Sequence, residues 1–168
     1  MTGDAVLVIG GITAAFVLAP VVLFPRRSVV GPRQLLTGAG SGAAAAAVWL
    51  VVVLVAPPVP PSTGAALAVT GAAALIAGFA GSGRGPGRLL AALLAAATAM
   101  GLIFAMVVTL AHWGPDTIVP DVTPQAPEAL RIPESRIEMV DPYVLILVLG
   151  ALAAAALSVV TALNRRRR

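Results

Sequence analysis

The sequence contains no cysteine and no lysine, and only 11% of its 168 residues are charged. Without cysteine, the chain has no disulfide, zinc–thiolate site or thiol nucleophile. Soluble domains are about a quarter charged. This chain is 59% hydrophobic with a mean hydropathy of +0.99, and it is too short to bury that much apolar surface in one aqueous core. Because apolar residues can face outward in lipid, the composition indicates an integral membrane protein.

Five apolar stretches are each long enough to cross a bilayer as a helix, which takes about 20 residues. They cover residues 5–24, 35–56, 64–81, 89–111 and 143–163, and none contains Asp, Glu, Lys or Arg. We therefore expect an all-α fold, a single transmembrane domain over 1–168 built as a bundle of five spanning helices. A loop of about 30 residues, 112–141, separates the last two spans, and a basic tail, 164–168, follows the fifth.

The charges predict how the chain is threaded. With five spans, nine of the eleven arginines lie on one side of the membrane: Arg26, Arg27, Arg33, Arg84, Arg88, Arg165, Arg166, Arg167 and Arg168. The opposite side holds all seven acidic residues and the other two arginines. Cytoplasmic flanks carry the excess of arginine, so we predict that the N-terminus and the long loop face outward and the C-terminus faces inward. Arginine in place of lysine, with abundant Ala and Gly, suggests a bacterium, and hence its cytoplasmic membrane.

The spans contain no ionisable side chain that would mark an ion path or a catalytic site. Their hydroxyl groups, such as those of Thr70 and Thr109, are expected to bond to the carbonyl one turn earlier. Pairs of small residues four positions apart allow two helix backbones to approach closely. The candidate packing positions are Gly38, Gly42, Ala74, Gly78, Gly150 and Ala154. They serve packing within one chain or contact with another subunit.

The outer loop has a proline-rich first half and a second half, EALRIPESRIEMV, that mixes charged and apolar residues. The first half favours an extended, polyproline-like course. The second suits either a short strand over 136–139 or helical turns beginning near Pro133. Its apolar residues, Leu130, Ile132, Ile137, Met139 and Val140, are not needed by a solvated spacer. They are candidates for covering the chain's own bundle as a lid or for contacting a partner.

No catalytic, cofactor or metal site is predicted. His112 with Asp116 and Asp121 matches no defined metal-ligand spacing. The chain contains a serine, a histidine and aspartates that could in principle form a Ser-His-Asp set with Ser135, but no nucleophile-elbow motif surrounds Ser135. The arginines are divided among membrane flanks, which argues against nucleic acid as a partner. Arg165, Arg166, Arg167 and Arg168 anchor the topology and are candidates for contact with lipid headgroups.

The first functional hypothesis is a non-enzymatic accessory or assembly subunit that contacts other membrane proteins, or itself, through its helices and outer loop. The alternative is a homo-oligomeric transport or channel component with an uncharged path. A third hypothesis is an enzyme at the membrane surface that uses loop carboxylates such as Asp116 and Asp121; it has the least support from the sequence.

Overall fold

The computed structural model describes residues 11, 15–16, 31–59, 64–80 and 85–166, and most of these residues are helical. The four longest helices are α2 (Pro32–Val55), α3 (Gly64–Ala80), α4 (Pro86–Trp113) and α6 (Asp141–Arg166). A 3₁₀ turn, η1 (Asp116–Ile118), and the helix α5 (Glu128–Glu138) lie between α4 and α6. No strand occurs in these ranges, so the predicted all-α fold is confirmed there. The predicted first span, 5–24, falls almost entirely outside them.

Proline and glycine account for the helix ends. Helices α2 and α4 each begin with a proline, Pro32 and Pro86, at a position where the missing N–H would have had no partner in the helix. Helix α2 ends before the Pro57-Pro58 pair, and α4 ends before Gly114 and Pro115. The long loop expected over 112–141 therefore starts slightly later and contains a helix of its own.

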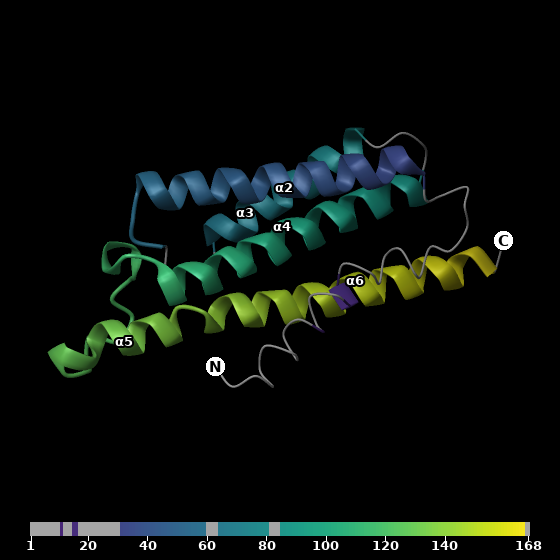
Figure 1. Ribbon diagram of the computed structural model, residues 1–168. Helices are drawn as coiled ribbons and strands as arrows, with labels where there is room; N and C mark the ends of the chain where they lie inside the picture. The colour runs from purple at the N-terminus through teal and green to yellow at the C-terminus, as the bar shows by residue number, and fades with distance from the viewer. Residues whose placement is uncertain (1–10, 12–14, 17–30, 60–63, 81–84, 167–168) are drawn as a thin grey trace.

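Consecutive long helices run in opposite directions (Figure 1). Helices α2, α3 and α4 pack together closely, with α4 in the middle of the core and α6 alongside it. This arrangement brings the starts of α2 and α4 and the end of α6 to one end of the bundle, and the acidic 116–141 segment to the other. Arg33 and Arg88 belong to the first turns of α2 and α4. The bundle is thus basic at one end and acidic at the other.

Gly38 and Gly42 lie where α2 crosses α4, and both are buried. A Cβ atom at Gly38 would come within 2.8 Å of the carbonyl oxygen of Ala91, and one at Gly42 within 2.5 Å of that of Ala95. Gly40, on the other face of α2, has nothing within 4 Å. The GxxxG pair therefore brings two helices of the same chain together.

The other candidate packing residues make looser contacts. A Cβ atom at Gly78 would lie 3.6 Å from the Cβ of Ala92 and 3.9 Å from the carbonyl oxygen of Arg88, and Ala74, one turn earlier, is half-buried. Gly150 lies against the ring of Phe16, and Ala154 is buried one turn further along α6. These small residues also face other parts of their own chain.

The outer surface of the bundle is apolar. Val51, Val55, Ile76 and Phe79 are all more than half exposed, which suits a lipid solvent. Three helical stretches are long and apolar enough to cross a membrane: α2, α4, and Glu128–Leu157, which consists of α5 and most of α6. Helix α3 has 17 residues and a length of about 26 Å, close to the thickness of a hydrocarbon core.

Two hydroxyl groups inside the apolar helices, those of Thr70 and Thr109, find partners in different ways. Thr109 donates to the carbonyl oxygen of Ala105, one turn earlier, at 2.8 Å as predicted. The prediction is wrong for Thr70, which donates instead to the sulfur of Met100 on α4 at 3.2 Å. This contact between α3 and α4 depends on the tertiary packing, because the two residues are 30 positions apart.

Candidate functional site

The segment between α4 and α6, residues 114–140, folds into a compact structure that we call the outer segment. Figure 1 shows α5 lying past the end of the bundle, on the side where α2 and α4 end and α6 begins. The outer segment consists of η1, an irregular stretch over 119–127 and α5. Pro115 and Val119 have extended backbone, but η1 lies between them, and the N–H groups of Val122 and Ala126 close turns onto Pro120 and Thr123. The extended course predicted for the whole proline-rich half is therefore not found. The alternative of a strand over 136–139 is wrong, because α5 covers Glu128–Glu138 and includes Pro133.

Arg136 attaches α5 to the end of α4. Its guanidinium donates to the carbonyl oxygens of Ala111 at 2.9 Å and Gly114 at 2.7 Å, and more weakly to that of Leu110 at 3.4 Å. It also bonds to the carboxylate of Asp116 at 2.6 Å. The last carbonyls of a helix lack intrahelical partners and carry partial negative charge, so a cation is favoured there. Arg136 is therefore a helix cap supplied from a distant part of the chain.

A short chain of hydrogen bonds joins α5 to the irregular stretch before it. The hydroxyl of Thr123 lies 3.2 Å from the carbonyl oxygen of Arg131 and 2.9 Å from the hydroxyl of Ser135. Because a carbonyl can only accept, Thr123 donates to it and Ser135 donates to Thr123. The oxygen of Ser135 accepts in turn from the backbone N–H of Val122 at 3.3 Å. Ser135 is 1% exposed, and its proton is committed to a structural bond.

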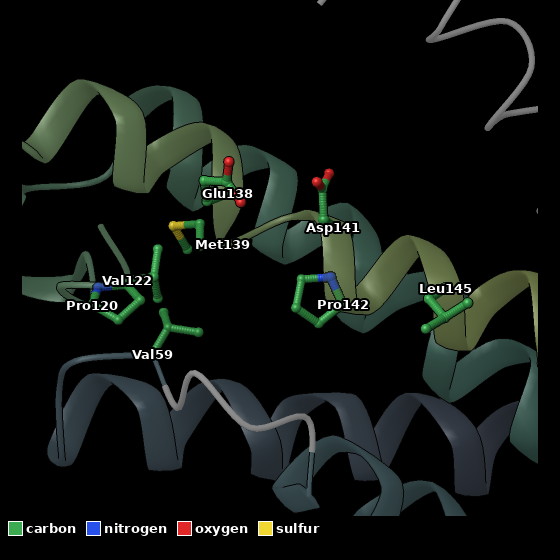
Figure 2. Close-up of a pocket in the computed structure, with 8 residues that line it drawn as sticks. All are labelled: Val59, Pro120, Val122, Glu138, Met139, Asp141, Pro142 and Leu145. Atoms are coloured by element: carbon green, nitrogen blue, oxygen red, sulfur yellow. The ribbon is translucent and has the colours of Figure 1, made fainter. Parts of the chain in front are cut away.

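The loop after α2 also contacts the outer segment. The backbone N–H of Val59 donates to the carbonyl oxygen of Ile118 at 2.9 Å, and both side chains are buried. Nearby lies a hollow of about 550 Å³ lined by Val59, Pro120, Val122, Glu138, Met139, Asp141, Pro142 and Leu145. Figure 2 shows the carboxylates of Glu138 and Asp141 pointing away from Val59. The walls are apolar and the acidic groups lie at the rim.

The five apolar residues predicted as lid or partner contacts divide into two groups. Met139 and Val140, just after α5, are 3% and 9% exposed and belong to the core of the bundle. Leu130, Ile132 and Ile137, within α5, are 49%, 41% and 72% exposed. The outer segment therefore rests on its own bundle through its C-terminal end, while α5 presents apolar side chains to its surroundings.

The polar residues considered for chemistry do not form one site. His112 is exposed and its ring packs edge-on against Trp113, with centroids 5.2 Å apart. Asp116 bonds to Arg136, and Ser135 bonds to Thr123 and Val122 instead of to a histidine. Within the described ranges, no three His, Asp or Glu side chains are grouped closely enough to hold a metal ion.

The basic tail is described only in part. Arg165 and Arg166 are the last two residues of α6, at the opposite end of the bundle from the outer segment. Arg167 and Arg168 lie outside the described residues. The proposed contact of this tail with lipid headgroups remains a prediction.

Comparison with known proteins finds no match. No protein-family model matches the chain, and neither a curated protein nor a solved structure is significantly similar to it.

The attachment of the outer segment was not predicted from the sequence. A helix ending at Trp113-Gly114-Pro115 leaves carbonyls without partners, which signals that a donor is needed. Nothing in the local sequence indicates that Arg136 supplies this donor, because Arg131 is an equally available arginine in the same segment. The pairing of Thr123 with Ser135 likewise has no sequence signal.

Proposed function

We propose that the chain is a five-span protein of a bacterial cytoplasmic membrane and acts as a non-enzymatic accessory or assembly subunit. The observation that carries this proposal is that α5 is anchored to α4 by Arg136 yet exposes Leu130 and Ile137. A rigid element with outward apolar side chains is suited to contact another protein. The proposed partners are other membrane protein subunits, and the lipid bilayer surrounds the spanning helices.

The proposed orientation places the N-terminus and the outer segment outside and the C-terminus inside. It is supported by the separation of basic and acidic residues at opposite ends of the bundle. Because the chain has no cysteine, a single cysteine can report each side. In spheroplasts, we expect a membrane-impermeant maleimide to label Glu134→Cys at once and Arg88→Cys only after permeabilisation. Both positions are exposed, so the opposite labelling pattern would contradict this orientation.

The accessory role predicts a stable partner. A tagged chain, extracted in a mild detergent, is expected to co-purify with a particular membrane protein in near-stoichiometric amount, as measured by quantitative mass spectrometry. The matched control is a Leu130→Ser/Ile137→Ser variant, which should fold equally well and retain less partner. Isolation of the wild-type chain alone, under several mild extraction conditions, would count against the role.

The alternative of a homo-oligomeric channel or transporter has weaker support. Gly38 and Gly42, the strongest small-residue pair, already contact α4 of the same chain and are covered by it. They are therefore not free to form an interface with a second copy. Flux of ions or small solutes in proteoliposomes containing only this chain would favour the alternative.

A further inference from the structure

The exposed side of α5 carries an apolar stripe next to acidic residues. Leu130, Pro133 and Ile137 are spaced by three and four positions, so they share one helical face, and all three are exposed. Glu134 and Glu138 follow along one edge of that face and are also exposed. Glu128 adds a third exposed carboxylate in the first turn of the helix.

The two arginines of α5 do not balance these charges on the exposed side. Arg136 is turned towards α4, where its guanidinium bonds to three carbonyl oxygens and to Asp116. Arg131 is half-buried, and its Nε atom is inaccessible to solvent. The tertiary structure thus commits Arg136 to the end of α4 and leaves Arg131 half-buried, whereas Glu128, Glu134 and Glu138 are exposed.

From this arrangement we infer that the Leu130–Pro133–Ile137 stripe binds a basic amphipathic segment of another protein. The inference rests on the proposed accessory function and names the chemistry of the partner. Apolar side chains of that segment would cover Leu130 and Ile137, and its Lys or Arg residues would face Glu134 and Glu138. Glu138 also borders the hollow beside Asp141, so the acidic surface continues beyond α5. Complementary charge of this kind promotes encounter and sets specificity.

The same charges disfavour two other occupants of the stripe, a membrane surface and a second copy of this chain. Helices that lie on membranes carry Lys and Arg on their polar face, because lipid headgroups are anionic, whereas α5 exposes Glu. A second copy in the same orientation would bring identical carboxylates together. The arginines at the end of α6 lie at the far end of the bundle and cannot compensate.

Binding of defined peptides by the purified full chain tests the inference. The chain is held in uncharged maltoside micelles, and the probes are two helical peptides with the same leucine spacing, one carrying Lys and the other Glu. We expect the Lys peptide to bind about tenfold more tightly. That preference should disappear near 1 M salt, where the screening length is about 3 Å.

Matched variants assign the effect to α5. Glu128→Gln/Glu134→Gln/Glu138→Gln should abolish the preference, and Leu130→Ser/Ile137→Ser should weaken binding of the Lys peptide. Asp121→Asn removes an exposed carboxylate of the outer segment that lies outside α5 and should leave binding unchanged. Thermal unfolding of each variant verifies its fold, and a variant that unfolds is replaced by the corresponding single substitutions. Equal affinity for the two peptides, or an unchanged preference in the triple variant, would overturn the inference.

Cross-linking in cells separates this inference from the broader proposal. A photoreactive amino acid is placed at Ile137, with Phe79, an equally exposed residue of α3, as the control position. The expected result is a cross-link from position 137 to a basic segment of another protein. A cross-link to lipid, to a second copy, or to a neutral or acidic segment overturns the inference. A co-purifying partner that cross-links only at position 79 would overturn it too and leave the accessory role intact.

Discussion

Gly42→Ala is expected to destabilise the helix bundle by about 1–3 kcal/mol, the usual cost of adding an atom to a packed core. The new Cβ would lie 2.5 Å from the carbonyl oxygen of Ala95 and 2.9 Å from the backbone nitrogen of Ala99. Neither backbone atom can move without shifting α4. Since α4 is central to the core, the substitution should lower the thermal unfolding temperature by several degrees.

Gly40→Ala is the matched control, because it makes the same chemical change on the same helix. No atom lies within 4 Å of a Cβ at Gly40. Any gain in helix propensity is common to both variants, so the difference between their unfolding temperatures reports packing alone. Fluorescence of the buried Trp49 follows unfolding, in a Trp113→Phe background that removes the exposed indole. Equal unfolding temperatures for the two glycine variants would contradict the α2–α4 packing described above.

Arg136→Ala is expected to loosen the outer segment without unfolding the bundle. A hydrogen bond to a charged group contributes about 1.5–3 kcal/mol, and here one side chain serves several carbonyls at the end of α4. Loss of that free energy should speed amide hydrogen exchange in α5 by roughly 10- to 150-fold. The 119–123 stretch should respond as well, because Ser135 of α5 bonds to Thr123 and to the backbone N–H of Val122.

Three further variants test the cause of that loosening. Glu134→Ala, on the exposed side of α5, should leave exchange unchanged. Asp116→Asn should have a small effect, because the carboxylate is 66% exposed and such ion pairs contribute about 0–1 kcal/mol. Arg136→Lys should be intermediate, since a single ammonium lacks the planar, multiple donors of guanidinium. Exchange in Arg136→Ala equal to wild type would rule out the capping role.

The composition was sufficient to predict the class of fold, because apolar surface on this scale must be covered by lipid or by other helices. Helix positions were also predictable, since the boundaries depend on local signals such as Pro32, Pro86 and Gly114. The span predicted over 89–111 and the observed helix α4, Pro86–Trp113, differ only by a few residues at each end. The candidate site was predicted less well, because the sequence located the outer segment but left strand and helix open for its second half.

The sequence by itself determined that the chain is apolar, helical and divided into basic and acidic flanks, because these properties sum over residues or depend on near neighbours. Only the tertiary structure decided the exposure of each side chain. Along the chain, Ile137 and Met139 look equivalent, yet one is 72% exposed and the other 3%. Residues two positions apart on a helix lie on opposite sides of it. The bonds of Arg136 to the end of α4, 22 to 25 residues earlier, fix which of these sides faces the bundle. Those long-range bonds turn the arginine inward and leave the stripe and its carboxylates facing out.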